Sequence, residues 1–287
     1  MRDNLPAMQG DFSALPDHRI LALEGPDATR FAQAQFMSDV TGLADGHWQW
    51  SGWLTPKGRV VALFALLRFD AQALWLLLPD ADPHDLRDAL QRFVFRSKVK
   101  LTVRDESHVA GRFARPSHAS GPHLANDSQV ELDVGTPEAP RTLRIADTSA
   151  TPDAEVLAQW KAYDLRHGLP RLDPSQANAW TPQQLSLDRL HAYSVKKGCY
   201  PGQEIVARTH FLGQAKRGLA LFEGHAVVPT GSDVVDGDRT LGTIVSSASD
   251  VATHVALAVL PLDHGNISPS ANGQPLRELP LSDGLAR

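Results

Sequence analysis

The sequence predicts an α+β fold that continues into a small antiparallel β-barrel. Three observations support this prediction: short apolar runs alternate with Pro and Gly turns over residues 18–104, two stretches there have helical periodicity, and closely spaced short strands follow residue 210. Strands linked by hairpins, with helices across them, are typical of α+β rather than parallel α/β domains. Because 287 residues exceed the usual size of one core, we expect more than one domain.

The N-terminal α+β domain is assigned to residues 1–104. Two apolar runs on either side of a Thr-Pro-Lys-Gly turn at residues 55–58 indicate a β-hairpin. Asp27 and Pro83 stand where amphipathic helices begin, since Asp caps a helix and Pro suits its first turn. The strands are predicted over residues 19–23, 47–54, 59–69, 73–78 and 98–103.

The second α+β domain is assigned to residues 105–210, and the C-terminal barrel to residues 211–287. The clearest element of the second domain is a helix over residues 153–167, which Asp153 begins and Gly168 ends. The strands predicted in the barrel cover residues 218–223, 232–235, 240–246 and 254–260. The last about 20 residues are rich in Pro and Ser, so we expect them to form a loosely packed tail.

The composition excludes several classes of function. The net charge is −5 and no basic run is visible, so we expect no direct nucleic-acid binding. The longest apolar run, residues 60–67, is too short to cross a bilayer, and the N-terminus has no signal-peptide pattern. No pair of cysteines and no His-Glu-x-x-His motif indicates a metal site. One cysteine forms no internal disulfide, which fits the cytoplasm, where we expect a monomer.

Chemistry is expected around the only cysteine, Cys199, which stands between cations and glycines. A thiol reacts as its thiolate, which the two preceding lysines or Arg208 would favour. The competing interpretation is a buried, inert cysteine, since free Cys is among the residue types most often buried. Gly198 and Gly202 suit a tight loop with unusual backbone angles rather than a core strand. We therefore predict a reactive thiol on a loop over residues 196–208.

Residues 197–204 read K-G-C-Y-P-G-Q-E, and Ala207-Arg208 follow. This stretch resembles the K-G-C-Y-x-G-Q-E signature of the YgfZ family of folate-binding proteins, relatives of the glycine-cleavage T-protein, an aminomethyltransferase. Further family landmarks are Ser38-Asp39-Val40, Lys57-Gly58-Arg59, Phe95-Arg96-Ser97-Lys98-Val99, Gly168-x-Pro170 and Pro182-Gln183. The chain departs from the pattern at Ser186-Leu187, where the family usually has Asn-Leu, and at residues 191–193, which replace a Gly-rich segment. The resemblance covers most of residues 18–260.

The resemblance implies the T-protein fold, in which two interleaved α+β domains and a C-terminal barrel surround a central hole. That hole would bind tetrahydrofolate or a one-carbon derivative. The family role it implies is support for the assembly or repair of iron–sulfur enzymes, including radical tRNA-modifying enzymes. The partners would then be folate and iron–sulfur client proteins or assembly factors. Because a cluster usually needs four cysteine ligands, a chain with one cysteine would assist these proteins without carrying a cluster itself.

The folate contacts are predicted from the chemistry of the ligand and from the resemblance. A flat pterin and an acidic tail require an aromatic or apolar slot and a cation. We predict Trp160 as one wall of the slot and His18 as the opposite wall. The competing interpretation makes Trp160 the largest core residue of its helix. The signature supplies Tyr200, Gln203, Glu204 and Arg208 as further candidate contacts, with Lys197, Gly198 and Gly202 as motif residues.

Two alternative functions remain open at this point. One is a folate-dependent aminomethyltransferase or demethylase, and the other is a cysteine hydrolase with His191 or His210 as its base. The T-protein carries an Asp-Asp pair after a Gly-Gly turn, and the corresponding positions here hold Ala62 and Leu63. Neither transfers a proton, and such catalysis is typically worth about 10²- to 10⁴-fold in rate. We therefore predict folate binding with negligible aminomethyltransferase activity, unless Glu204 supplies the missing acid.

Overall fold

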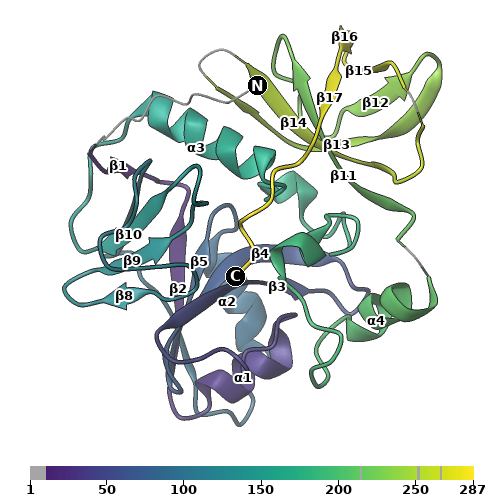
Figure 1. Ribbon diagram of the computed structural model, residues 1–287. Coiled ribbons are helices and arrows are strands. Elements are labelled where there is room, and N and C mark those ends of the chain that lie inside the picture. Colours follow the sequence, from purple (N-terminus) through teal and green to yellow (C-terminus); the bar gives the residue numbers. More distant parts are fainter. Residues whose placement is uncertain (1–10, 214, 251–252, 266) are drawn as a thin grey trace.

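A computed structural model describes residues 11–213, 215–250, 253–265 and 267–287. The described strands form three sheets of five, five and seven strands, and every pairing between them is antiparallel (Figure 1). Helices pack against the sheets, and the third sheet curls into a nearly closed barrel. The predicted α+β fold with a C-terminal antiparallel barrel is therefore confirmed.

The first sheet has the strand order β3-β4-β5-β2-β6. Its strands are β2 (Arg19–Glu24), β3 (His47–Leu54), β4 (Val60–Asp70), β5 (Ala73–Leu78) and β6 (Lys100–Val103). Helices α1 (Ala28–Gln35) and α2 (Pro83–Gln91) pack on one face of it, against side chains such as Phe64 of β4. Leu63, which precedes Phe64 in β4, belongs to the core cluster on the opposite face of the sheet. Because both faces are covered, β4 is apolar over most of its length.

The second sheet has the order β1-β7-β10-β9-β8. Its strands are β1 (Ser13–Ala14), β7 (His108–Arg112), β8 (Ala125–Asn126), β9 (Val130–Asp133) and β10 (Thr142–Ala146). Strand β1 precedes the whole first sheet in the chain and yet pairs with β7, so the two α+β parts are interleaved. Helix α3 (Ala154–Arg166) contacts β1 on one side and the barrel strands β13 and β14 on the other. Asp153 caps it as predicted, accepting hydrogen bonds from two amides of the first turn.

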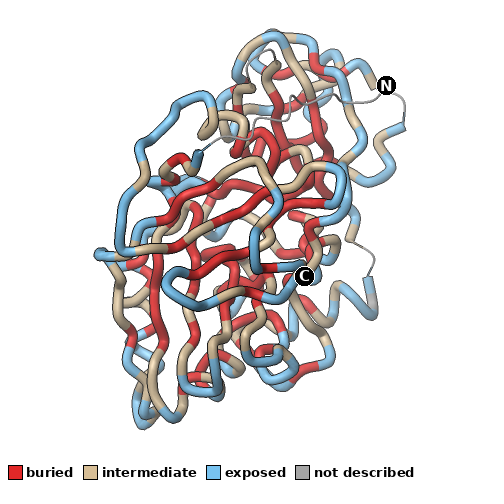
Figure 2. The backbone as a smooth tube through the Cα atoms, turned by 60° about the vertical axis from the view of Figure 1, so that its left-hand side comes forward, coloured by how far each residue is buried: buried red, intermediate tan, exposed pale blue. Residues whose placement is uncertain are grey.

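The barrel sheet has the order β16-β15-β12-β13-β14-β11-β17. Its strands are β11 (Arg217–Gly224), β12 (Asp233–Asp236), β13 (Arg239–Ser249), β14 (His254–Pro261), β15 (Pro269–Ala271), β16 (Gln274–Pro275) and β17 (Arg277–Leu279). It encloses a core of its own around Phe222 and Ile244. A larger cluster takes side chains from all three sheets, including Leu63, Leu143 and Leu257. Buried backbone accordingly runs through the whole molecule (Figure 2).

The structure corrects two expectations about irregular segments. The loop predicted over residues 196–208 ends at Gly202, because helix α4 (Gln203–Leu212) begins at the next residue. The segment predicted as a loosely packed tail forms β15 to β17 and then turns back to the middle of the molecule, where the C-terminus lies in Figure 1. There Leu285 is 2% exposed. The Pro and Ser composition misled the prediction, because the segment pairs as strands and buries several apolar side chains, including Ala271, Leu276 and Leu285.

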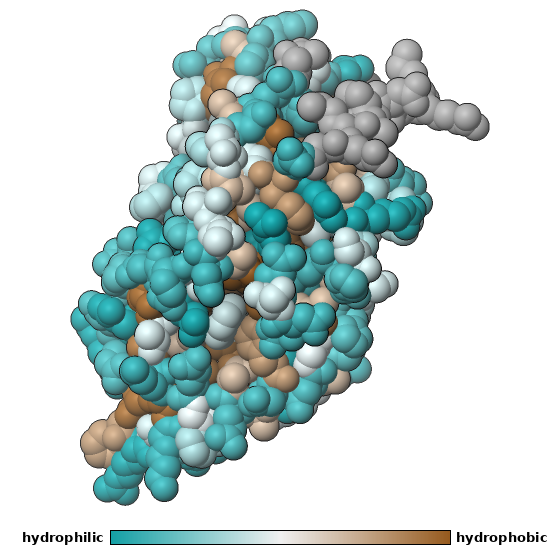
Figure 3. Space-filling view, turned by 90° about the vertical axis from the view of Figure 1, so that its left-hand side faces the viewer, coloured by the Kyte–Doolittle hydropathy of each residue, from teal (hydrophilic) through white to brown (hydrophobic). Residues whose placement is uncertain are grey.

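The surface offers no sign of a membrane span. None of the helices in the described part of the chain is both long and apolar enough to cross a bilayer. The face shown in Figure 3 is mostly hydrophilic, and apolar atoms reach the surface mainly near its middle. Two regions remain as candidates for a functional site: the signature loop and the core where the three sheets meet.

Candidate functional site

Lys197 fastens the signature loop to the end of α1. Its side chain is buried, and the Nζ atom donates to the carbonyl oxygens of Phe36 at 2.6 Å and Ser38 at 2.8 Å. Burial lowers the pKa of this lysine to about 8. Its ammonium group is thus engaged with backbone 160 residues away, so its main visible role is to hold the loop rather than to face the thiol.

Gly202 fastens the other end of the loop to the turn between β3 and β4. Its φ angle is +78°, which glycine adopts without strain, as predicted. A Cβ atom at this position would lie 2.6 Å from the Thr55 carbonyl oxygen and 2.7 Å from Gly58 Cα. Two stretches that sequence analysis singled out separately, the signature and the Lys-Gly-Arg turn, are therefore in direct contact. The prediction of an unusual angle at Gly198 is wrong, because Gly198 has no positive φ and open space around it.

The remaining inner residues of the loop tie it together. Tyr200 is buried, its hydroxyl donates to the Ser194 carbonyl at 3.0 Å, and burial raises its pKa. The Gln203 side chain donates to the Lys197 carbonyl at 3.0 Å and so closes the loop on itself. Gln183, another family landmark, donates from Nε2 to the Val206 carbonyl of α4 at 2.9 Å. These hydrogen bonds give most of the signature residues a structural role. Together they hold the loop in one conformation, and we call them the frame of the loop.

Cys199 stands at the exposed tip of this frame. The structure confirms that the thiol is exposed, as the sequence predicted. Glu204 and Arg208 are exposed on α4 beyond it. A fixed backbone that presents an accessible sulfur is suited to attack on a carbon, to exchange with another thiol or to transient ligation of a metal.

Trp160 and His18, the two predicted walls of the folate slot, line one small cavity at the centre of the molecule. The cavity measures about 20 Å³, and Trp50, Arg141 and Leu169 also line it. Trp160 is 1% exposed and packs so closely on Gly111 that a Cβ atom there would lie 2.5 Å from the ring. His18 is buried, which lowers its pKa well below the usual range. Its Nδ1 atom finds no hydrogen-bond partner among the described residues.

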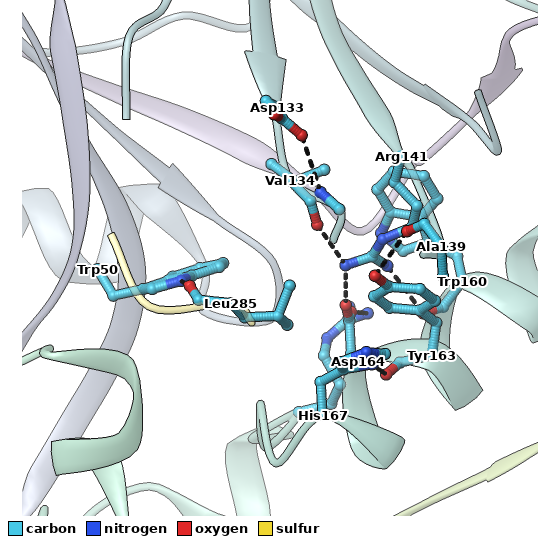
Figure 4. A network of polar contacts seen from close by, with 12 residues as sticks. Trp50, Asp133, Val134, Ala139, Arg141, Trp160, Tyr163, Asp164, His167 and Leu285 are labelled. Atoms are coloured by element: carbon cyan, nitrogen blue, oxygen red, sulfur yellow. Dashed lines mark hydrogen bonds and ion pairs between the residues drawn. The ribbon is translucent and has the colours of Figure 1, made fainter. Parts of the chain in front are cut away.

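A buried charge network forms one side of this centre (Figure 4). Arg141 lies between Asp164, at 2.8 Å, and the rings of Trp160 and Tyr163, whose centroids are 4.2 and 3.8 Å away. Arg171 continues the network, with Nη1 at 3.3 Å from Asp164 and Nε at 2.8 Å from the Asp80 carboxylate. Two guanidinium groups thus face two carboxylates, so neither arginine is free to bind a ligand's carboxylate. This network was not predicted from the sequence, because single Arg and Asp residues far apart in the chain form no recognisable motif.

A larger groove lies beside α4. It has a volume of about 370 Å³, in the range of small-molecule sites. Arg189 and Gln183 lie in its wall, each with a buried side-chain atom (Nη1 and Oε1) that has no partner among the described residues. The other lining residues are Ser186, Asp188, Tyr193, Thr209, His210, Gly213, Ala215, Arg217, Gly218 and Leu262. Both segments in which the chain departs from the signature pattern thus contribute to this groove.

The closed centre has the chemistry expected for folate but not the size. Indole rings and an unpartnered imidazole nitrogen suit a pterin, whereas 20 Å³ holds about one water molecule. The groove has the size, and Arg189 brings a cation to it. The cavity that Trp160 and His18 line is too small for folate in this structure, so their role as walls of a folate site stays a prediction.

Comparisons with known proteins agree with this architecture. No protein-family model matches the chain. It is 28% identical over 262 residues to the tRNA-modifying protein YgfZ of Cronobacter sakazakii, with 82% of this chain and 79% of the relative covered. The YgfZ of Aliivibrio fischeri is 28% identical over 273 residues, covering 88% and 85%. The chain belongs to the YgfZ family.

Two further similarities extend the YgfZ assignment. An uncharacterised Haemophilus influenzae protein is 31% identical over 218 residues, which are 74% of this chain and 73% of that protein. The solved aminomethyltransferase T of the glycine cleavage system from Bartonella henselae superposes with a TM-score of 0.72 at 12% identity, covering 92% of this chain and 83% of that one. At this identity the second similarity shows the fold alone. The YgfZ signature of this chain is therefore carried on a T-protein fold, as the sequence predicted.

Proposed function

We propose that this YgfZ-family protein binds tetrahydrofolate or a one-carbon derivative and supports the assembly or repair of iron–sulfur enzymes, including radical tRNA-modifying enzymes. Cys199 is the reactive thiol in this proposal. The observation that carries it is the contrast within the signature: Lys197, Tyr200 and Gly202 are fixed in the protein, and only the cysteine side of the loop is presented to a partner. A frame of this kind serves chemistry between proteins better than chemistry in a closed pocket.

The folate part of the proposal rests on the fold and on the composition of the centre. The T-protein-like fold brings Trp50, Trp160 and the buried His18 together around one cavity. Arg189 supplies a cation in the groove beside α4. When bound, a folate would supply or accept a one-carbon unit. The chain's own residues would stack on the pterin and orient the tail.

The alternative of an aminomethyltransferase is not favoured by the residues of β4. Ala62 and Leu63, which replace the two T-protein carboxylates, are 3% and 4% exposed and belong to the apolar clusters on either face of the sheet. Glu204, the suggested substitute acid, is exposed on α4. Folate binding without efficient turnover therefore remains our prediction.

The cysteine hydrolase alternative finds no support in the hydrogen bonds of the described residues, since neither His191 nor His210 is bonded to Cys199. His210 lies seven residues beyond the start of α4, so it is about 10 Å along the helix axis from Gln203. A base must lie within hydrogen-bond reach of its nucleophile. His191 is exposed and ends the short 3-10 helix η2 (Leu187–Leu190) in a left-handed conformation.

The proposal is tested by two measurements on the same pair of variants. Calorimetric titration with tetrahydrofolate under argon should show binding by the wild-type protein and equally by Cys199→Ala. In cells that lack the endogenous protein, wild type should restore the activity of a radical iron–sulfur tRNA-modifying enzyme, and Cys199→Ala should not. Lys196→Met, which alters the exposed neighbour in the loop, is the control and should restore it. Full rescue by Cys199→Ala would remove the thiol from the proposal.

A further inference from the structure

The C-terminal strap, residues 282–287, contacts the wall of the central cavity at Trp50. Trp50, which lines the cavity, donates from its indole nitrogen to the Leu285 carbonyl at 2.8 Å (Figure 4). Leu285 itself is 2% exposed within the shared core. Beyond it, the Arg287 guanidinium donates to the carbonyls of Gly135 at 2.7 Å and Asp133 at 3.0 Å. The strap therefore lies against Trp50 and against the segment around Val134, both of which line the cavity.

The other end of the strap reaches the groove beside α4. Arg189, in the wall of that groove, donates from Nη2 to the Ser282 carbonyl at 2.8 Å and to the Asp283 carboxylate at 2.7 Å. The amide of Ser282 donates to the Arg166 carbonyl at the end of α3. The strap therefore connects a wall residue of the larger groove, Arg189, with a wall residue of the small cavity, Trp50.

The groups that hold the strap are those that a folate would use. Asp283 places a carboxylate on Arg189, and the Leu285 carbonyl accepts from the Trp50 indole beside the aromatic wall. A folate likewise carries carboxylates on its glutamate tail and carbonyl acceptors on its pterin and amide. The strap thus offers these two wall residues the kinds of acceptor that a folate would offer.

We propose that the strap is a built-in competitor for the folate site: the cavity and the groove are two parts of one channel, which opens to tetrahydrofolate only when residues 282–287 leave. This inference rests on the proposed folate binding. It explains why a centre with the right chemistry has room for about one water molecule. The pterin would lie between Trp50 and Trp160, and the glutamate tail would take the place of Asp283 on Arg189.

The strap is suited to leave, because few of its contacts are buried. The Asp283 side chain is 89% exposed although it is paired with Arg189. Leu285 is the one side chain of the strap that is deeply buried in the core. A ligand that binds only the open state has its apparent affinity reduced by the fraction of molecules that are open. If that fraction is about 1–10%, opening the strap permanently should strengthen binding by about 10- to 100-fold.

The test compares tetrahydrofolate affinities by calorimetry under argon. A chain truncated after Leu281 and the full-length variant Leu285→Asp should both bind about 10- to 100-fold more tightly than wild type. Asp283→Ala, which removes one exposed ion pair and leaves the core intact, should bind a few-fold more tightly. Val227→Asp, a change at an exposed apolar residue of the barrel, is the matched control and should bind like wild type.

A second readout follows the strap itself. Hydrogen–deuterium exchange of the peptide that covers residues 282–287 should become faster in wild type when tetrahydrofolate is added, because the ligand displaces it. Equal or weaker binding by Asp283→Ala and Leu285→Asp, or slower exchange on adding the ligand, would show that the strap is a wall of the site and would overturn the inference. If neither wild type nor any variant binds tetrahydrofolate, the proposed folate function fails as well.

Discussion

The signature loop and the central cavity carry functional groups in opposite states. Cys199 is exposed at the tip of a loop that Lys197 and Gly202 hold from both ends. Trp160 and His18 are buried in a centre of about 20 Å³. The loop is therefore ready to meet a partner as it stands, whereas the centre must rearrange to meet a ligand.

The two regions therefore differ in which of their parts are held in place. The loop contains one tightly packed glycine, Gly202, and a buried cation, Lys197, which fix the backbone while the Cys199 side chain stays exposed. The strap beside the centre is held by hydrogen bonds that involve backbone carbonyls, by the ion pair of Asp283 and by the buried Leu285. Substitutions of the residues that hold the loop should lower the free energy of unfolding, whereas substitutions at its exposed tip should leave it nearly unchanged.

The largest effect on stability is expected from Gly202→Ala. The new Cβ atom would meet backbone atoms of residues 55 and 58 at 2.6–2.9 Å, in a left-handed conformation that alanine disfavours. We expect a loss of about 3–4 kcal/mol in the free energy of unfolding. Urea denaturation measures it. Gly198→Ala is the matched control, since a Cβ atom there meets open space; a similar loss for both variants would contradict this account of the loop.

The centre should be the region that is sensitive to acid. His167 stacks on Tyr163 at 4.0 Å, and burial lowers its pKa to about 4. Between pH 6.5 and 4 the unfolded chain therefore binds a proton at this residue that the folded protein does not. Stability should fall as the pH falls through this window, by at most about 1.4 kcal/mol per unit from this group.

Thermal unfolding of wild type and His167→Gln between pH 4 and 7 checks this prediction. The variant should show a shallower fall, because glutamine does not titrate and can still donate to the Tyr163 carbonyl. His191→Gln, at an exposed position, should leave the wild-type slope unchanged. Parallel curves for wild type and His167→Gln would exclude His167 as the source.

A smaller loss is expected from Lys197→Met. The substitution leaves the carbonyls of Phe36 and Ser38 without their buried donor, while the longer part of the side chain is retained. We expect a loss of about 2 kcal/mol. The exposed neighbour gives the control Lys196→Met, which should stay within about 0.5 kcal/mol of wild type. If both lysines tolerate methionine equally, the buried ammonium does not anchor the loop.

The smallest effect on stability is expected from Cys199→Ala. The side chain is exposed and contributes little packing, so the free energy of unfolding should change by less than about 0.5 kcal/mol. Urea denaturation of this variant, beside the cellular assay proposed above, separates folding from function. A loss of 2 kcal/mol or more would mean that the thiol supports the loop instead of acting from it.

The sequence by itself determined most of the strands, the helix capped by Asp153 and the exposure of Cys199. These features depend on local patterns: alternation of apolar residues, capping residues and the glycine that allows φ of +78° at position 202. The signature residues also identified the family, because their identities and spacing match its motif. The fold then followed from the resemblance of that family to the T-protein. Helix α4 was missed, since Gly and Pro before it made the whole stretch look like a loop.

Only the tertiary structure decided what the centre looks like. The bond between Trp50 and the Leu285 carbonyl joins residues 235 positions apart, and Lys197 binds carbonyls 161 and 159 positions before it. No periodicity or composition records such contacts, because they arise from the way three sheets close on one another. The same long-range packing made Arg141 and Asp164 partners and brought residues 282–287 into contact with Arg189 of the groove and Trp50 of the cavity wall. The burial of Leu285 depends on how the three sheets assemble, so composition did not predict it. For this reason the C-terminal segment is packed against the core, although the sequence predicted a loose tail.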